Sequence, residues 1–214
     1  MTDSAASVEK LDILDEVGNP IGVKDRDAVH RDGDLHRVFH CLIVAGRLDG
    51  VAVLQLRAKR KAAYPGLLDL SAAGHLASGE EPLDGIREIA EELGVDDIPR
   101  TRLIELGTRQ FADDSGEGTL NRELIHVHLV RDDRSLIDYK PNRSEVGGVF
   151  DAPINDALEL FGGDVDSLEL DGVVRGKWVR REVTLADFVP GSAYWIALLV
   201  MAQRYLDGHR PIAI

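Results

Sequence analysis

The sequence predicts a single domain of the α+β class, in which helices cover a mixed β-sheet. Short apolar runs typical of strands are joined by many connections of hairpin length, which favours a sheet. Three other segments repeat their apolar residues with the period of a helix. Neither a repeat nor a low-complexity linker divides the 214 residues. Because sheet and helices each have an apolar face to bury, they are expected to stack as the layers of a sandwich.

The predicted elements run from an N-terminal pair of strands to a C-terminal helix. Turn residues at 18–20 separate the first two strands, and a Gly-rich loop at 113–118 separates two later ones. The predicted strands are 10–16, 21–24, 38–45, 51–56, 67–73, 101–111, 123–130 and 146–150, with a hairpin around Asp171 and Gly172. The predicted helices are 82–93, 154–161 and 193–206. The single domain, 1–214, then has N-terminal strands and a turn (1–33), a core (34–161) and a C-terminal helical extension (162–214).

The charge of the chain restricts its partners. The formal net charge is −13 at pH 7, and a surface this acidic repels nucleic acid backbones and anionic membranes. The longest apolar run, residues 194–202, is about half as long as a membrane span. With one cysteine, Cys41, and no apolar export signal in residues 1–10, the chain is expected in the cytoplasm. A phosphate-bearing ligand would need local cations, and the dense basic run lies at 57–61.

The segment 82–93 carries the strongest chemical signal. One side of the predicted helix is apolar and is expected to be buried: Leu83, Ile86, Ile89, Ala90 and Leu93. The opposite side holds Glu88, Glu91 and Glu92 at spacings i, i+3 and i+4, so the three carboxylates are neighbours. Mg²⁺ and Mn²⁺ prefer such oxygen ligands. The segment therefore predicts either a cation site facing an open cleft or a solvated acidic face where Arg87 pairs with Glu91. Gly94 ends the helix in both interpretations.

Together with the residues before it, this segment resembles the Nudix box. The matching positions are Gly74, Glu80, Arg87, Glu88, Glu91, Glu92 and Gly94, with apolar residues at 89 and 95. One departure is that six residues separate Glu80 from Arg87, where the family pattern has seven. The departure implies a tighter loop before the helix or a displaced Glu80. The resemblance implies a Nudix-type α/β/α sandwich around a mixed sheet and a loop–helix–loop that binds Mg²⁺ or Mn²⁺.

The resemblance also implies roles for individual residues. The metal ligands would be Glu88, Glu91 and Glu92, while Arg87 would orient a carboxylate and Gly74 would let the backbone approach the metal. The implied reaction is attack of an activated water on phosphorus, with the cation neutralising charge on the leaving phosphate. Glu145 is expected near the metals, either as a general base or as an ordinary loop carboxylate. Arg57 and Lys61, in the basic run, are expected to meet the substrate diphosphate, for which a guanidinium is well shaped.

Beyond the box, the chain is similar to the branch of the superfamily related to isopentenyl-diphosphate isomerase. The segments that carry this resemblance are 12–16, 29–33, 35–40, 54–57 and 65–75. Isomerases of this type place a catalytic cysteine directly before a Gly-His pair, where this chain has Ala73. Cys41 lies in an apolar run and is expected to be a small buried residue. Because isomerisation would lack one acid–base partner, hydrolysis is favoured.

The isomerase resemblance implies a second metal site. In the isomerases, the histidines that correspond to His30, His36 and His75 bind a metal together with a glutamate after the loop, here Glu123. Three imidazoles and a carboxylate suit Zn²⁺ or Mn²⁺. The alternative is that His30 and His36 hydrogen-bond to backbone at turns, while His75 binds a substrate phosphate. Sequence spacing alone leaves both interpretations open.

These observations predict a metal-dependent hydrolase that cleaves a diphosphate linkage in a small molecule, such as a nucleoside diphosphate derivative. One alternative is a non-catalytic binding or regulatory module that kept the fold, and a second is an isomerase-like enzyme acting on a prenyl diphosphate. The shortened box favours the module, whereas the complete glutamate set favours the hydrolase. The expected partner is the small-molecule substrate, with a homodimer as an open question. Neither nucleic acid nor a membrane is expected as a partner.

Overall fold

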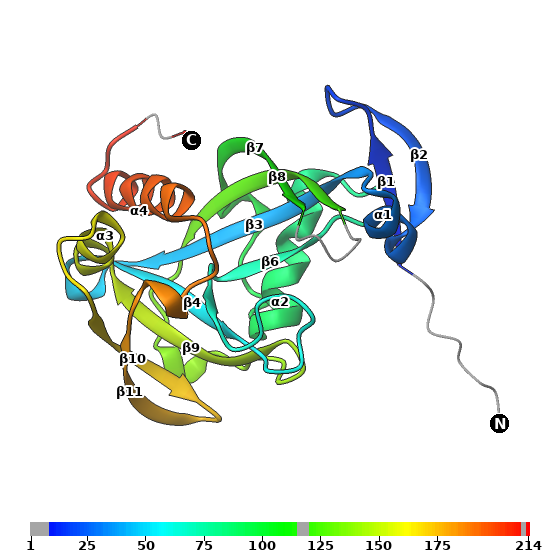
Figure 1. Cartoon of the computed structure of the whole chain (residues 1–214). Helices are drawn as coiled ribbons and strands as arrows, with labels where there is room; N and C mark the ends of the chain where they lie inside the picture. The colour runs from blue at the N-terminus through cyan, green and yellow to red at the C-terminus, as the bar shows by residue number, and fades with distance from the viewer. Residues whose placement is uncertain (1–8, 115–119, 211–212) are drawn as a thin grey trace.

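The structure is a computed structural model, drawn in Figure 1, and it describes residues 9–114, 120–210 and 213–214. The strands are β1 (Lys10–Leu14), β2 (Pro20–Asp25), β3 (Leu35–Ala45), β4 (Val51–Arg57), β5 (Leu68–Asp69), β6 (Ala72–His75), β7 (Ile104–Asp114), β8 (Leu120–Arg131), β9 (Val146–Pro153), β10 (Leu168–Val174) and β11 (Lys177–Val183). The α-helices are α1 (Arg26–Asp32), α2 (Arg87–Leu93), α3 (Ile154–Gly162) and α4 (Ser192–Leu206). Short 3₁₀ turns are η1 (Arg47–Asp49), η2 (Pro82–Ile86), η3 (Arg100–Arg102), η4 (Leu136–Asp138) and η5 (Leu185–Asp187).

The strands of the described residues form one mixed sheet. Its main path has the order β11-β10-β9-β4-β3-β1-β2, and β5, β6, β7 and β8 branch from it. β3 is the central strand because it pairs along both edges. One edge pairs in parallel with β8, and the other meets β1, β6 and β4 in succession, all antiparallel. This pairing brings the N-terminal strands and the segment around Gly74 to the same half of β3.

The sheet separates two apolar cores. Alternate residues of β3 point to opposite faces, so Phe39 and Ile43 pack on the side of α2, whereas Leu42 packs on the side of α3 and α4. Ile89 and Leu93 of α2 join the first core and are fully buried. Figure 1 shows α3 and α4 stacked beside each other on one face and α2 on the other. Helices on both faces of a mixed sheet make an α/β/α sandwich, which confirms the predicted fold class.

Most predicted elements are present with ends shifted by a few residues, and the segment predicted at 67–73 is divided into β5 and β6. Two local predictions were wrong or incomplete. Helix α1 was not predicted, because Val29 is its one buried residue and leaves no apolar stripe in the sequence. The C-terminal hairpin turns at Arg175 and Gly176, whereas Asp171 and Gly172 lie inside β10. Residues 115–118 of the predicted Gly-rich loop lie outside the described residues.

The segment predicted as one helix at 82–93 is only partly α-helical. Its first five residues form the 3₁₀ turn η2, and α2 begins at Arg87. Leu83, which was predicted to be buried, is therefore 41% exposed, and Ile86 and Ala90 are only partly buried. A side chain at Gly85 would overlap Phe39, so a glycine lets η2 lie directly on β3. This compact turn is the tighter loop that the shortened motif implies.

The C-terminal extension is not only helical. Strand β10 pairs with β9 and β11 pairs with β10, so residues 168–183 widen the central sheet before α4 begins. Helix α4 then packs against α3 on the sheet face away from α2. None of the described helices has the length and the apolar run that a bilayer crossing requires.

Candidate metal centres

The short helix α2 and the loop before it are joined by Arg87. Its Nε and Nη2 donate to the two carboxylate oxygens of Glu80 at 2.8 and 3.0 Å, and Nη2 also donates to the His75 carbonyl at 2.9 Å. Glu80 in turn accepts a hydrogen bond from the Ala77 backbone N–H at 2.7 Å. These bonds to Arg87 lower the pKa of Glu80. Glu80 thus fixes Arg87 from the loop side, even though the segment between them is one residue short.

Glu88 is held against the backbone of β6. Its carboxylate lies over Gly74 so closely that a Cβ atom on residue 74 would overlap it. Arg87 Nη1 donates to Glu88 Oε1 at 2.6 Å, and the residue as a whole is 8% exposed. Gly74 was predicted to admit a metal to the backbone. What the structure shows is that Gly74 leaves space for the Glu88 carboxylate itself.

Glu92 is buried one turn further along α2. Its Oε2 accepts hydrogen bonds from the Ala73 backbone N–H and from Gln55 Nε2, both at 3.0 Å. Its Oε1 faces the Lys61 ammonium at 3.9 Å. Glu92 is 4% exposed and Glu88 is 8% exposed. The two residues are therefore buried, and the prediction that they line an open cleft or a solvated face was wrong. Strand β6 packs against α2 and covers this side of the helix as well, and Glu92 reaches Gln55 of β4.

Glu91 is the exposed member of the set. Its side chain is 58% exposed, and it pairs at 3.3 Å with Arg87 Nη1, the same nitrogen that binds Glu88. We call Glu88, Glu91 and Glu92 the glutamate cluster. Its oxygens are not gathered within 4.8 Å of one another, and Arg87 and Lys61 lie at its edges. Like charges repel, so each carboxylate is drawn toward a donor or cationic neighbour rather than toward the other two.

Burial has a large effect on the two inner carboxyl groups. Loss of hydration raises the pKa of Glu88 to about 7, despite the opposing pull of Arg87. It raises the pKa of Glu92 to about 7 as well, despite its hydrogen bonds and Lys61. A divalent cation would compensate the charges that burial penalises, and the donor set consists of the hard oxygens that Mg²⁺ and Mn²⁺ prefer. The residues present therefore fit such a cation.

The other predicted polar residues lie around this cluster. Glu145 forms an ion pair with Lys61, so the Lys61 ammonium lies between Glu145 and Glu92. Arg57 pairs with Asp69 at 2.8 Å and donates to the Ala63 carbonyl at 3.1 Å. Its guanidinium is thus already bound within the protein. Asp69 and Gln55 were missed in the sequence, since one carboxylate and one amide in apolar strands carry no recognisable spacing.

The three histidines predicted for a second metal converge in the structure. Helix α1 supplies His30, β3 supplies His36 and β6 supplies His75, with ring centroids 5.0 to 5.1 Å apart. Nε2 of His30 lies 3.2 Å from Nε2 of His75. Of the residues that the structure describes, these three are the one set whose ligand atoms all lie within 4.8 Å of one another. We call them the histidine cluster.

The hydrogen bonds of His36 show which nitrogen is available. Its Nδ1 donates to the Asp34 carbonyl at 3.0 Å, which leaves Nε2 as the unprotonated nitrogen. This Nε2 is buried and has no hydrogen-bond partner among the described residues. Burial lowers the pKa of His36 to about 4 and also lowers the pKa values of His30 and His75. Neutral imidazoles with an unpartnered nitrogen fit a metal such as Zn²⁺, because a metal-binding histidine typically donates its other ring N–H to a carbonyl or carboxylate, as His36 does to Asp34.

Glu123, the predicted fourth ligand, is near the histidine cluster but not in it. It is opposite His36 in the register between β8 and β3. Its Oε1 accepts a hydrogen bond from Asn121 Nδ2 at 2.7 Å, and burial raises its pKa. The two clusters themselves meet at β6, because Gly74 contacts Glu88 while His75 belongs to the histidine cluster.

The residue at the position of the isomerase cysteine has a structural role here. Ala73 presents its backbone N–H to Glu92, and its methyl side chain offers no acid–base group. Cys41 is fully buried, as predicted, and burial raises the pKa of its thiol well above the usual range. A thiol of this kind is unreactive.

Comparison with known proteins gives matches over nearly the whole chain. An uncharacterised Nudix hydrolase of Clostridium acetobutylicum is 33% identical over 202 residues, which cover 91% of this chain and 96% of the relative. An isopentenyl-diphosphate Delta-isomerase of Saccharopolyspora erythraea is 29% identical over 194 residues, covering 89% and 92%. No family model matches the chain.

Two solved structures support the fold. A protein from Deinococcus radiodurans superposes with a TM-score of 0.57 at 21% identity, covering 72% of this chain and 90% of the other. A Nudix hydrolase from Alicyclobacillus acidocaldarius superposes with a TM-score of 0.52 at 13% identity, covering 85% and 98%. At these identities the similarity concerns the arrangement of the strands and helices alone.

Proposed function

The chain belongs to the Nudix hydrolase family, and on this premise we propose that it hydrolyses a diphosphate linkage in a small molecule with Mg²⁺ or Mn²⁺. The observation that carries the proposal is the burial of two carboxylates, Glu88 and Glu92, beside an exposed third, Glu91. Buried carboxylates without a compensating cation are costly. Their retention on one helix is expected where a bound cation offsets that cost.

The glutamate cluster, Arg87 and Glu145 would each have a separate role in the hydrolysis. A divalent cation held by the glutamate cluster would act as a Lewis acid and offset the negative charge on the diphosphate oxygens. Arg87 keeps Glu88 and Glu91 in place, and its own position is fixed by Glu80. Water adds to phosphorus and the bridging P–O bond breaks, so each product keeps one phosphate end. Glu145 is the candidate base that takes the proton of this water.

Lys61 would change partners when the substrate binds. Without substrate its ammonium pairs with Glu145 and faces Glu92. A bound diphosphate offers it a stronger anionic partner, and the shift of Lys61 would release Glu145 to act on water. Arg57, which pairs with Asp69 at the end of β4, would contact the same diphosphate by exchanging one of its present partners.

We also propose that the histidine cluster holds a second metal ion, Zn²⁺ or Mn²⁺. Support comes from the convergence of three neutral imidazoles and from the unpartnered His36 Nε2. Glu123 could complete the ligand set after a change of rotamer away from Asn121. A homodimer remains a prediction.

The test of the proposed function is turnover in Mg²⁺ over a panel of nucleoside diphosphate derivatives and prenyl diphosphates. Glu92→Gln is expected to lower the rate about a hundredfold or more, because loss of a metal ligand removes several kcal/mol from the transition state. Glu159→Gln, a change at an exposed helical glutamate away from the cluster, should leave the rate unaltered. Melting temperatures in a chelator would show that both variants fold.

Three outcomes separate the alternatives. Release of a phosphate-ended product that depends on Glu92 supports the hydrolase. Binding of the panel compounds without any turnover would identify a binding module instead. Conversion of one prenyl diphosphate to its double-bond isomer would contradict the assignment, since Ala73 has no group that could move the proton.

A further inference from the structure

A pocket with basic walls lies beside the glutamate cluster, on the α2 face of the sheet. Its volume is about 280 Å³, and it lies between the loop at 139–143, the start of β9 and the turn from β10 to β11. The residues around it are Tyr139, Lys140, Pro141, Arg143, Val146, Gly147, Gly148, Val173, Arg175 and Gly176. Three of them are glycines, so main chain forms part of the wall. The volume suits a phosphate group and a small substituent.

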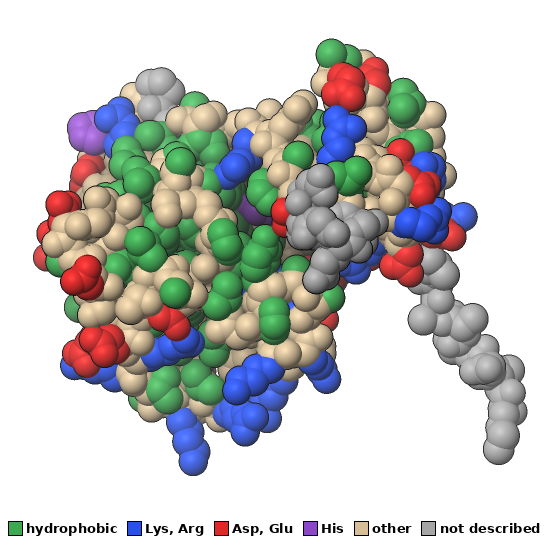
Figure 2. Space-filling view, viewed as in Figure 1, with side chains coloured by type: hydrophobic (Ala, Val, Ile, Leu, Met, Phe, Trp, Pro, Cys, Tyr) green, Lys and Arg blue, Asp and Glu red, His purple; other side chains and the backbone are tan. Residues whose placement is uncertain are grey.

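The charges around this pocket are uncompensated. None of its ten described lining residues is acidic, and Lys140, Arg143 and Arg175 form no ion pair with any described residue. Most other arginines of this acidic chain have carboxylate partners, as Arg87 and Arg134 do. Figure 2 shows Lys and Arg side chains gathered at the lower edge of the view, where Figure 1 places the end of the β10–β11 hairpin.

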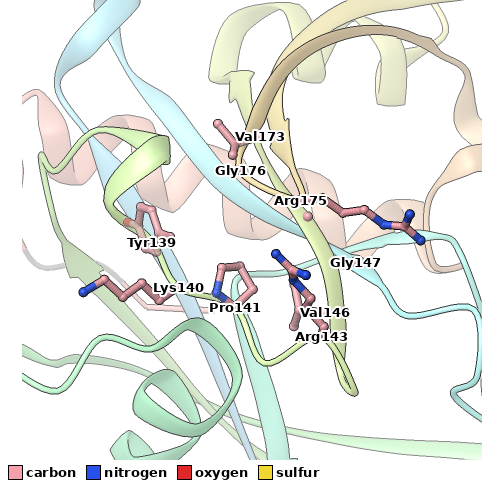
Figure 3. Close-up of a pocket in the computed structure, with 10 residues that line it drawn as sticks. Tyr139, Lys140, Pro141, Arg143, Val146, Gly147, Val173, Arg175 and Gly176 are labelled. Carbon is pink, nitrogen blue, oxygen red and sulfur yellow. The ribbon is translucent and has the colours of Figure 1, made fainter.

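Arg143 and Arg175 provide the guanidinium groups of the pocket. Figure 3 shows the Arg143 guanidinium rising from its loop between Pro141 and the β10–β11 turn, while the Arg175 side chain extends from that turn to the right, away from Arg143. Both side chains are exposed, so Arg175 can turn toward an anion bound at Arg143. The Lys140 ammonium points away from both in the same view. Guanidinium groups bind phosphate oxygens through paired N–H donors, which makes them better suited to this ligand than an ammonium.

Arg175 also has an unusual backbone conformation. Residue 175 has φ of 53° and is followed by Gly176 with φ of 74°, so both central residues of this hairpin turn are left-handed. Such turns favour Asn-Gly, and an arginine in this conformation is uncommon. The turn therefore places Arg175 at the rim of the pocket at a cost in local stability, which is a feature of functional positions.

The pocket is coupled to the glutamate cluster by its own loop. The backbone N–H of Lys140 donates to the Leu93 carbonyl, and that of Asn142 to the Glu92 carbonyl, both at 2.9 Å. Arg143 precedes Glu145 by two residues, so their Cα atoms are within about 7 Å of each other. A ligand in the pocket would thus lie near the ion pair of Glu145 and Lys61.

We propose that this pocket binds a phosphate group through Arg143 and Arg175. The phosphate belongs either to the substrate, at the end away from the cleaved bond, or to free phosphate released by turnover. The first source rests on the proposed function and the second does not require it. Binding at this site does not involve the metal cations.

The experiment measures binding of inorganic phosphate by calorimetry in a chelator, against chloride at equal ionic strength. The wild type should bind, and Arg143→Gln should bind about tenfold more weakly, the loss expected from one charge-assisted hydrogen bond. Arg175→Asn should also bind more weakly while its melting temperature stays equal or rises, because asparagine suits the turn. Lys177→Gln, one residue beyond the turn and outside the pocket, is the matched control.

Kinetic constants of the same variants identify the source. A raised KM in Arg143→Gln with an unchanged kcat assigns the phosphate to the substrate. An unchanged KM together with weaker inhibition by added phosphate assigns the site to free phosphate. If the wild type does not bind phosphate, or if both arginine variants bind it as the wild type does, the proposal is wrong. Absence of hydrolysis would overturn the proposed function and leave the phosphate titration as an independent result.

Discussion

The glutamate and histidine clusters share β6 but respond to burial in opposite ways. At Glu88 and Glu92 burial raises the pKa to about 7, and the favoured neutral form is the one that cannot ligate a metal well. At His36 burial lowers the pKa to about 4, and the favoured neutral form is the ligand. The histidine cluster is therefore assembled in advance. At the glutamate cluster, a bound cation would shift the two carboxyl groups toward the ionised form that ligates it.

The geometry of the two clusters agrees with this difference. The imidazole nitrogens approach one another to within 4.8 Å because neutral rings do not repel strongly. The glutamate oxygens lie apart from one another, next to the guanidinium of Arg87, the amide of Gln55 and the ammonium of Lys61, which stabilise their negative charge. For the two proposed metal sites, the comparison predicts that affinity at the histidine cluster is set by geometry and that affinity at the glutamate cluster is set by charge.

The largest expected effect tests the position of Glu88. Gly74→Ala places a methyl group where the carboxylate lies, and residue 74 does not have a positive φ, so the backbone itself tolerates alanine. Displacing the ligand should lower Mg²⁺-dependent turnover on the order of a hundredfold. Overpacking should cost about 1–3 kcal/mol of stability. Steady-state kinetics and chemical denaturation measure the two effects.

Gly162→Ala is the control for that change. A Cβ atom there would meet only the flexible Asp164 carboxylate, at 3.3 Å, near the end of α3. Normal turnover in Gly162→Ala and in Gly74→Ala alike would show that the glutamate cluster does not depend on the close approach of Glu88 to β6.

A second prediction concerns the independence of the clusters. His36→Gln should weaken Zn²⁺ binding by about tenfold or more, since altered ligand sets lose affinity on this scale. Mg²⁺ binding at the glutamate cluster should be unaffected. Competition with a chromogenic chelator measures the first and calorimetry the second.

Because His36 is fully buried, His30→Gln on the half-buried helix face provides a second variant that is easier to accommodate. Glu92→Gln should show the reverse pattern, with Zn²⁺ retained and Mg²⁺ lost. Equal Zn²⁺ affinity in the wild type and both histidine variants would remove the histidine cluster as a metal site.

The smallest expected effect is the pH dependence of stability without metal. Between pH 4.5 and about 7 the unfolded chain releases the protons of Glu88 and Glu92 while the folded chain keeps them, so stability falls as pH rises. Between about pH 4 and 6.5 the unfolded chain takes up a proton at His36 that the folded chain does not, so this group makes stability rise with pH.

Variants separate these opposed contributions. The double change Glu88→Gln and Glu92→Gln should stabilise the metal-free protein at pH 8 by on the order of 2 kcal/mol, with little change at pH 4.5. Denaturation in a chelator across this pH range is the measurement. Parallel stability curves for the variant and the wild type would show that the two carboxyl groups are not perturbed by burial.

Several features of the site were predictable because they are local. The Nudix-box glutamates lie within one helix, and their spacing fixes that they are neighbours whatever the rest of the chain does. Gly94 has a φ of 66° and ends α2, as its sequence position indicated. The apolar runs at 38–45 and 51–56 predicted the central strands β3 and β4, because strands buried on both faces consist of continuous apolar residues.

Other features depend on contacts between distant segments. The docking of α2 on the sheet decided which of its sides is covered. Glu88 and Glu92 are therefore buried, whereas the sequence predicted that they line an open cleft or a solvated face. The same docking set their pKa values, and it placed Gln55 and Lys61 beside Glu92.

The sequence by itself determined the family motif, the layered fold class and the identity of the candidate ligands. Tertiary structure decided that His30 and His75, 45 positions apart, would meet through the pairing of β3 with β6 and the packing of α1. It also decided that Arg143 and Arg175 would border one pocket. The physical reason is that sheet register is set by the total burial of both faces, and no short segment contains that information.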